Sequence, residues 1–396
     1  MNLRILNINN RCTGCGACVS VCAKGALRLE YDSEGFYYPI LDSTKCVGCR
    51  LCEKVCHALY ETKHKEIVRD YSAFMVKAYD KNLLKKSSSG GVFSLLAEAV
   101  LKEGGIVYGA RYNYELERLE HCSTDKVSLD ELRKSKYVES YMGNTFLDVR
   151  RQLQSGRKVL FCGTPCQVKG LCNYLKTLRT NTENLFAVRF VCHGVPSNRF
   201  LTEYKHWKEK KVGSKIVHMD FRPKTRGWRM SNMLLKFENG KVIDELYQEN
   251  YYYYYYYFQK NLSLRRSCYN CHLIEESFSD YTIADFWGIH KYQPQNKDSE
   301  GISLVLAHNQ KAESMLELLD CDVERLPQQA VEYIYKDAID KKVLFDERNK
   351  EIQGFIREGY MNHTKRVLRN DIIIFKIKTR IGALLRKSAL WRKIRK

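Results

Sequence analysis

The stretch Cys12–Cys22, CTGCGACVSVC, decides the N-terminal fold, because Cys46–Cys56, CVGCRLCEKVC, repeats its pattern 34 residues later. Both stretches have C-x2-C-x2-C-x3-C spacing, and in each a glycine, Gly14 or Gly48, lets the backbone turn tightly before the second cysteine. Two such runs in tandem are typical of bacterial two-cluster ferredoxins. There the first three cysteines of a run bind one [4Fe–4S] cluster and the fourth binds the other.

This spacing predicts two interleaved sets of metal ligands. One set is Cys12, Cys15, Cys18 and Cys56, and the other is Cys22, Cys46, Cys49 and Cys52. Zinc is the alternative metal, but tetrahedral zinc sites do not need two interleaved runs of four cysteines. Ala23 and His57 replace the proline that usually follows the fourth cysteine, which leaves the ligand count unchanged. Two clusters in series would carry single electrons, so we expect a further redox centre in the rest of the chain.

The composition indicates a globular protein of two or three units. The chain has 396 residues, of which 44% are hydrophobic and 28% charged, and it contains 16 cysteines. The first residues lack the pattern of a secretory signal, and no apolar run approaches the roughly 18 residues that span a bilayer. Many cysteines in such a chain favour metal or redox chemistry in a reducing cytoplasm over disulfides.

The central part of the chain has an α/β pattern. FMVKAY at 74–79 predicts a strand. The Ser/Gly-rich turn after it opens a predicted helix that ends at Gly104–Gly105 and has its apolar residues at helical spacing: Val92, Leu95, Leu96, Ala99 and Val100. A strand should then begin at Ile106. The glycine-rich turn offers free N–H groups that suit a phosphate, although an ordinary helix cap has the same sequence pattern.

Two further strand–turn–helix patterns place cysteines just after strands. Cys166 follows the strand in RKVLFCGTPCQ, and Cys192 follows the strand in LFAVRFVCHG. Ligands of open α/β sheets bind at this edge. The pair Cys268 and Cys271 in RRSCYNC is locally ambiguous, because half of a metal site, a redox dithiol and two core residues all fit it. Four other cysteines are expected to be small core residues: Cys122, Cys162, Cys172 and Cys321.

Several motifs occurring in order give the chain a resemblance to a known family. They are KSSSGGVFS, SKYVESYMG, FCGTPCQVKGL, CHGVPS, FRPKTRGW, LRRSCYNC and DYTIADFWG. Together they resemble the family of beta subunits of coenzyme F-420 hydrogenases and dehydrogenases. With the ferredoxin-type stretch, the resemblance covers about three quarters of the chain. Ala284 departs from the glycine that is more common in the last motif, so the loop that carries Asp285 and Trp287 is expected to differ locally.

The resemblance implies FAD and a third [4Fe–4S] cluster in the central domain. The implied ligands of this cluster are Cys166, Cys192, Cys268 and Cys271. The implied flavin-binding residues are Ser88, Ser89, Gly90, Gly91, Ser135, Lys136, Tyr137, Gly163, Thr164 and Lys224. His193 and Asp285 lie in motif loops and are candidates for proton transfer, and the alternative is that both fix loop conformation.

The positive charge is concentrated in the tail. The formal net charge is +20, and residues 365–396 contribute +11 of it. This tail has the pattern of a basic amphipathic helix, which suits an anionic membrane, a partner protein or solvent. No nucleic-acid-binding module accompanies the charge, so nucleic acid is not an expected partner. The run Tyr251–Phe258 is expected to pack near the third cluster.

These observations predict an α/β (α+β) multidomain protein. The expected units are a two-[4Fe–4S] ferredoxin domain at 1–62, a linker at 63–72, a flavin and [4Fe–4S] domain at 73–320, a helical extension at 321–364 and a basic tail at 365–396. The expected function is that of a cytoplasmic iron–sulfur flavoprotein oxidoreductase, peripheral to the membrane if the tail binds lipid. It would connect a hydride carrier (an F-420-like deazaflavin or a small, sugar-linked substrate) to a redox partner such as a ferredoxin or another subunit. The alternative is a non-enzymatic electron-carrying or partner-binding subunit with only the ferredoxin clusters.

Overall fold

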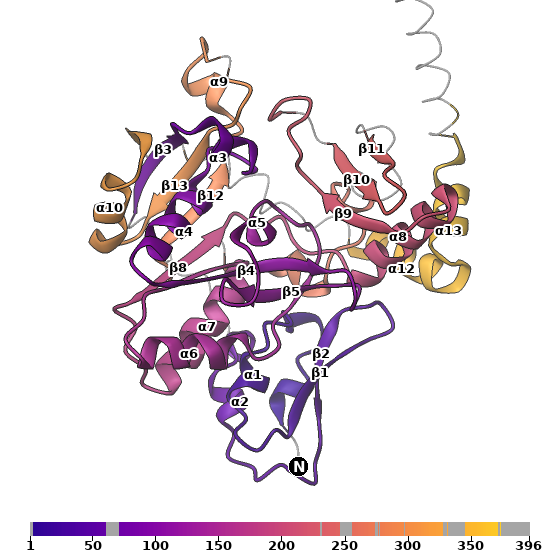
Figure 1. Cartoon of the computed structure of the whole chain (residues 1–396). Coiled ribbons are helices and arrows are strands. Elements are labelled where there is room, and N and C mark those ends of the chain that lie inside the picture. Colours follow the sequence, from indigo (N-terminus) through magenta and orange to yellow (C-terminus); the bar gives the residue numbers. More distant parts are fainter. Residues whose placement is uncertain are drawn as a thin grey trace, which may run out of the picture.

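A computed structural model gives the fold of the chain (Figure 1). It describes residues 3–60, 71–229, 232–245, 256–273, 276, 278–296, 298–327, 331, 345–370 and 373. The expected linker at 63–72 and the expected basic tail therefore lie almost wholly outside the described residues, as do Tyr251–Tyr255. No helix within the described part of the chain has the length and apolar character that crossing a membrane requires.

The N-terminal module is built from short elements around two cysteine-rich turns. Its helical segments are η1 (Arg4–Leu6), η2 (Asn9–Arg11), α1 (Ala17–Ser20), α2 (Leu51–Lys54) and η3 (His57–Leu59), and its hairpin pairs β1 (Leu27–Tyr31) with β2 (Tyr37–Leu41). Gly14 and Gly48 have φ angles of 68° and 71°, as the tight turns predicted from the sequence require. The two cysteine runs therefore adopt the same local backbone.

A nine-stranded sheet forms the centre of the described residues, in the order β14-β3-β13-β12-β8-β7-β4-β5-β6. Its middle strands β4, β7, β8 and β12 are mutually parallel, which brings their carboxyl ends to one edge. The bounds are β3 (Ser72–Ala78), β4 (Ile106–Asn113), β5 (Arg118–Ser123), β6 (Ser140–Tyr141), β7 (Val159–Gly163), β8 (Leu185–Phe190), β12 (Tyr281–Asp285), β13 (Ser303–Ala307) and β14 (Cys321–Leu326).

Helices cover both faces of this sheet. One face, with Val107 and Leu160, packs against α4 (Val92–Lys102) and α10 (Gln310–Glu317). The other, with Ile106 and Val159, packs against α6 (Thr145–Gln154), α7 (Pro165–Thr177) and the N-terminal module. Alternate residues of each middle strand are thus buried on opposite faces, which explains why these strands read as continuous apolar runs. Four short helices complete this part: α3 (Lys81–Lys85), α5 (Leu129–Leu132), α9 (Ile289–Tyr292) and η5 (Arg266–Asn270).

A smaller three-stranded sheet forms a second core. It pairs β9 (Ile216–Asp220), β10 (Met233–Phe237) and β11 (Val242–Glu245), and it lies beside α8 (Asn198–Val212), α12 (Phe345–Glu358) and α13 (Tyr360–Val367). Tyr257 and Phe258, at the described end of the tyrosine run, are buried in this core. The run therefore contributes packing at this point.

The elements predicted around the cysteines are confirmed, and one boundary is wrong. The strands at β3, β4, β7 and β8 and the helices α4, α7 and α8 occur where the sequence pattern placed them. Residues 321–326, expected to begin a helical extension, instead form β14, which pairs with β3 along the edge of the large sheet. Cys321 is buried there, because an edge strand still packs one face onto the core.

The N-terminal module shares its hydrophobic core with the α/β domain. Ile5, Ala17 and Val55 of the module belong to the same buried cluster as Phe146 of α6 and Leu171 of α7. Figure 1 shows the module, in indigo, directly beside these two helices. The packing therefore fixes the module on the sheet.

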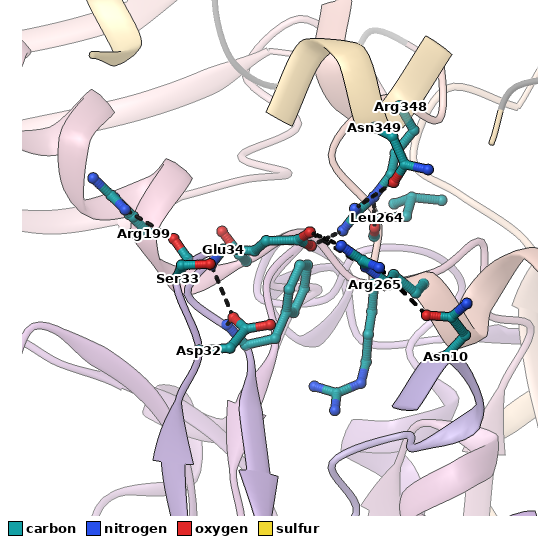
Figure 2. Close-up of polar contacts among 12 residues, drawn as sticks. Asn10, Asp32, Ser33, Glu34, Arg199, Leu264, Arg265, Arg348 and Asn349 are labelled. Carbon is teal, nitrogen blue, oxygen red and sulfur yellow. Dashed lines mark hydrogen bonds and ion pairs between the residues drawn. The ribbon is translucent and has the colours of Figure 1, made fainter. Parts of the chain in front are cut away.

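A buried carboxylate adds an ionic link between the module and the C-terminal helices. Glu34, in the turn between β1 and β2, accepts hydrogen bonds from Arg348 of α12 and from Arg266 (Figure 2). Arg348 is fully buried and also donates to the carbonyl of Leu264. Burial alone raises the pKa of Glu34, but the two guanidinium groups outweigh it, so the pKa lies below its ordinary value.

The Glu34→Ala substitution should destabilise the protein by about 3–5 kcal/mol, because it leaves Arg348 buried without its counter-charge. The matched control is Glu30→Ala in the exposed Arg28–Glu30 pair, which should cost about 0–1 kcal/mol. Thermal unfolding under anaerobic conditions measures the difference. Equal losses in the two variants would contradict the assignment.

The same link predicts a pH dependence of stability. A carboxylate whose folded-state pKa is depressed stabilises the protein above the pKa of the unfolded chain, and this contribution is lost as the pH falls through the folded pKa. The stability difference between wild type and Glu34→Ala should therefore be full at neutral pH and shrink below about pH 4.5, the ordinary value of a glutamate.

Candidate functional site: cysteine sets beside a sheet-edge cavity

The structure brings several cysteines of each predicted set close to one another. Burial raises the pKa of Cys18, and the thiols of Cys15, Cys12 and Cys56 lie close enough to raise it further. In the other set, burial raises the pKa of Cys52 to about 11, and Cys22 and Cys49 add to the shift. Buried thiols with raised pKa values resist becoming thiolates unless a metal compensates their charge. Burial raises the pKa of the core cysteines Cys172 and Cys321 to about 11 as well, so it is the closeness of the thiols that fits shared metal ligation.

The spacing of the thiols is wider than a single metal ion requires. A tetrahedral zinc ion holds sulfur ligands about 2.3 Å from the metal. In the described residues, which include all 16 cysteines, no three thiols lie within 4.8 Å of one another. A cluster of several metal atoms separates its ligands further, so the arrangement favours [4Fe–4S] clusters over zinc.

One group of side chains does meet the distance criterion for a single ion, and it already holds a cation. Glu117, His206 and Glu209 converge, but the Lys205 ammonium lies 2.7 Å from both carboxylates. Lys205 is 4% exposed. The group is therefore an internal ion pair.

Four more cysteines come from distant segments to a place beside α7. Cys166 lies in the first turn of α7, and its buried thiol has a raised pKa to which Cys192 and Cys271 contribute. Cys268 packs against Gly194, where an added Cβ would lie 3.2 Å from the Cβ of Cys268. The segments that carry these residues are thus brought together, as a shared ligand set requires.

Helix α7 connects this third group to the N-terminal sets. Cys15 is among the thiols whose charge affects Cys166. One helical turn further on, Gly170 approaches Cys15 so closely that an added Cβ would lie 3.0 Å from its sulfur. The third group and the set of Cys12, Cys15, Cys18 and Cys56 are therefore neighbours.

A cavity of about 480 Å³ opens at the carboxyl ends of the parallel strands. Its wall includes Gly163 and Thr164 after β7, Cys192 and His193 after β8, and Asp285 at the end of β12. The volume falls in the usual range of small-molecule sites, and the position is the edge where open α/β sheets bind ligands. Because Thr164 Oγ1 lies 3.1 Å from the Cys166 sulfur, the cavity borders the third cysteine group.

Most of the residues expected to contact a flavin lie on this wall: Ser88, Ser89, Gly91, Ser135, Lys136, Tyr137, Gly163 and Thr164. The Ser88 hydroxyl accepts a hydrogen bond of 2.8 Å from the Ser135 amide, which ties two of the loops together. Gly90 is not on the wall. It lies against the sheet, where an added Cβ would meet the Val76 carbonyl oxygen at 2.2 Å. Its role is therefore to permit close packing.

The structure does not bring Lys224 to the cavity wall. Its ammonium donates to the backbone carbonyls of Leu84, Ser89 and Glu300, and burial lowers its pKa to about 8. Lys224 therefore supports the serine-rich loop from behind. A motif alone could not show where so long a side chain ends.

Asp285 and His193 both line the cavity, but their surroundings differ. Asp285 accepts hydrogen bonds from the Trp228 indole at 2.7 Å and from Arg222 at 3.0 Å, so its carboxylate is engaged in holding the loop. This favours the loop-fixing alternative for Asp285. The His193 ring packs against Phe258, with centroids 4.9 Å apart.

Sequence reasoning missed a buried arginine between the cysteine groups. Arg265 is 1% exposed and donates to the carbonyls of Cys12 and Tyr37 and to the Glu139 carboxylate. Its charge also acts on Cys268. The signal was its place in LRRSC, three residues before the predicted ligand Cys268. Cys162, expected to be a core residue, packs on the core and also lines the cavity.

Comparison with known proteins identifies two sequence families in the chain. Residues 156–324 match the family described as the C terminus of the coenzyme F420 hydrogenase/dehydrogenase beta subunit. Residues 11–58 match the 4Fe-4S dicluster domain. Both matches coincide with the segments that carry the cysteine groups.

Individual relatives match parts of the chain. One subunit of the F(420)H(2) dehydrogenase of Methanosarcina mazei is 24% identical over 165 residues, which is 39% of this chain and 46% of that subunit. An uncharacterized ferredoxin of Methanocaldococcus jannaschii is 38% identical over 56 residues, 14% of this chain and 71% of the ferredoxin. The chain thus spans less than half of the dehydrogenase subunit it matches.

Among solved structures, the F420-reducing [NiFe] hydrogenase complex from Methanosarcina barkeri contains a chain that aligns with a TM-score of 0.45 and 17% identity. The alignment covers 73% of this chain and 96% of that chain.

The Cys268→Ser substitution should lower the iron content from about twelve to about eight atoms per chain, because it removes a ligand of the third group only. Cys321→Ser is the matched control, since Cys321 is buried in the edge strand away from all three groups and should leave the iron content unchanged. Iron analysis and EPR of anaerobically purified protein give the result. Zinc in the wild-type third group would contradict the prediction.

Proposed function

Because the chain belongs to the family of coenzyme F420 hydrogenase/dehydrogenase beta subunits and carries a 4Fe-4S dicluster domain, we propose that it is an iron–sulfur flavoprotein oxidoreductase subunit. In this proposal the sheet-edge cavity binds FAD, and three [4Fe–4S] clusters connect it to the surface. The observation that carries the proposal is the contact between the cavity and the third cysteine group, at Thr164 and Cys166.

The cavity suits a flavin in its donor groups. Hydroxyl and amide groups of the loops at Ser88 and Ser135 lie on one side, and the first turn of α4, at Gly91 and Val92, also faces the cavity. Backbone N–H groups at a helix N-terminus bind phosphate well. A bound flavin would supply the conversion of a hydride into single electrons.

Other residues beside the cavity hold its loops in position. Arg222, 4% exposed, joins the Tyr137 hydroxyl to the Asp285 carboxylate, which fixes two loops of the cavity relative to each other. Trp287 stacks on the buried Trp228 with ring centroids 5.0 Å apart. The walls of the cavity are therefore held rigidly before a ligand binds.

The hydride carrier that we propose is a reduced deazaflavin. The support is the relative from Methanosarcina mazei, which is named as a subunit of an F(420)H(2) dehydrogenase. Because of that relative, we favour a deazaflavin over a sugar-linked substrate as the hydride carrier. We also propose that this chain works with another subunit or a separate redox protein, which receives the electrons.

Lys136 supplies a cation at the cavity wall. Its ammonium donates to the backbone carbonyls of Arg133 and Lys134, and burial lowers its pKa to about 7. Neighbouring Lys134 differs, because its ammonium is paired with Asp220 at 2.6 Å. Lys136 is therefore the cation better placed to balance an anionic group of a bound flavin.

Lys136→Gln should weaken FAD binding roughly tenfold or more, since it removes a charge-assisted hydrogen bond worth about 1.5–3 kcal/mol. In the wild type, affinity should also fall as the pH rises from 6 to 8, because the free lysine loses its charge near pH 7. The variant should lack this pH dependence, and Lys134→Gln should retain it. Flavin fluorescence titration of the flavin-depleted protein measures both effects, and equal behaviour of the two variants would contradict the role.

Anaerobically purified protein should contain about twelve iron atoms and one FAD per chain, and reduced deazaflavin should reduce its clusters. Chemical analysis and anaerobic spectroscopy test this directly. About eight iron atoms and no flavin would overturn the proposal and support a non-enzymatic electron-carrying or partner-binding subunit.

A further inference from the structure

The two cysteine runs have the same backbone but opposite surroundings. The first run packs against α6 and α7, and between its cysteines it holds small uncharged residues, Thr13, Gly16 and Ser20. Gly16 is buried, and an added Cβ would lie 3.2 Å from the Met142 Cβ. The first run thus faces the inside of the molecule.

The second run carries large and basic residues at the corresponding positions. Val47, Arg50 and Lys54 stand 34 residues after Thr13, Gly16 and Ser20, and all three are exposed. Val47 is 63% exposed, which is unusual for an apolar residue that directly follows a predicted ligand. Arg50 adopts the left-handed conformation (φ 58°) that glycine adopts at position 16 (φ 76°). An arginine at this position costs backbone strain that a glycine would avoid.

The positive charge of this outer loop, which we define as residues 45–54, is largely uncompensated. Arg50 and Lys54 take part in none of the ion pairs found among the described residues. Lys45 pairs with Asp42 at 3.1 Å but remains 61% exposed. The acidic residue of the loop, Glu53, is buried and accepts a hydrogen bond from the Arg4 backbone amide. The loop therefore presents a basic surface around the exposed apolar side chain of Val47.

This surface lies over the ligand set nearest to solvent. Of the twelve cysteines in the three groups, Cys49 is classed as exposed, and the others are half-buried or buried. The third group and the set of Cys12, Cys15, Cys18 and Cys56 lie inward, against α7. Electrons that pass along the three groups would therefore reach the surface at the outer loop.

We propose that the outer loop is the docking surface for a one-electron carrier protein whose own redox centre is surrounded by acidic residues. The proposal rests on the function proposed above, because it concerns the surface end of the same electron path. One electron passes between the group bound by the outer cysteines and the carrier, and no covalent bond or proton is involved. Weak electron-transfer encounters use small interfaces and electrostatic steering, which suits a basic rim around Val47.

The experiment compares two double variants of the full chain. Lys45→Glu with Lys54→Glu reverses charge in the outer loop. Lys215→Glu with Lys241→Glu makes the same net change at exposed residues that flank strands of the small sheet, away from the module. Each protein is reduced with dithionite and mixed anaerobically with a small acidic ferredoxin or with cytochrome c, a basic carrier. Stopped-flow absorbance gives the rates.

At an ionic strength of about 0.01 M, where charges act over about 30 Å, the outer-loop variant should react about tenfold more slowly with the ferredoxin. It should react faster with cytochrome c, and both effects should disappear at about 1 M salt. The small-sheet variant should behave as wild type. A damaged cluster would slow the reaction with both carriers. A slower reaction with the ferredoxin together with a faster one with cytochrome c therefore identifies charge as the cause.

Three results would overturn the proposal. The first is equal rates for the two double variants, and the second is equal slowing of the outer-loop variant's reactions with both carriers. The third is unchanged rates for the outer-loop variant together with loss of its binding to phosphatidylglycerol vesicles, which would make the surface a membrane contact. Iron content and the EPR spectrum are matched beforehand, and Lys45→Gln with Lys54→Gln replaces the reversal variant if that variant loses iron. Because dithionite supplies the electrons, a protein without flavin would contradict the proposed function and leave this test intact.

Discussion

The arrangement of the cysteine groups depends on one buried cation. Arg265 has almost no access to water, so each of its donors must find an acceptor inside the protein. It finds them in the Cys12 and Tyr37 carbonyls of the N-terminal module and in Glu139 of the α/β domain. Since Cys268 follows three residues later, the same arginine fixes one cysteine group relative to another. The distance between the groups is thereby set by a hydrogen-bond network and a shared core.

The spacing of residues within short segments made some features predictable from the sequence, whereas contacts between distant segments could not be predicted from it. The two N-terminal sets follow from ligand spacing within short segments, and β7, β8 and α7 follow from apolar periodicity and Pro165. The approach of Cys268 to Gly194 depends on the order of strands in the sheet, which periodicity does not specify. A resemblance of ordered motifs supplied that grouping in advance. Lys224 shows the limit of this method, because a motif specifies a residue type without stating which atoms its side chain contacts.

Boundaries were the weakest part of the prediction from sequence. Residues 321–326, CDVERL, alternate in polarity only over their first four positions, which is too short a run to identify an edge strand, and pairing with β3 defines them. The ferredoxin-type module looked separable because its motif is self-contained. In the structure its apolar residues complete the core under α6 and α7, so its stability and that of the α/β domain are coupled. The sequence motifs therefore predicted which cysteine-bearing segments come together better than they predicted the domain boundaries.

Gly170 gives this coupling a kinetic meaning. Electron tunnelling declines exponentially with distance, so a gap of one methyl group matters more to a transfer rate than to folding. Gly170 lets the backbone of α7 rest against the Cys15 sulfur, while Cys166, one turn earlier on the same helix, belongs to the next group. In the electron path proposed above, the helix would act as a spacer of minimum thickness, and any side chain at position 170 would widen the gap between the two groups.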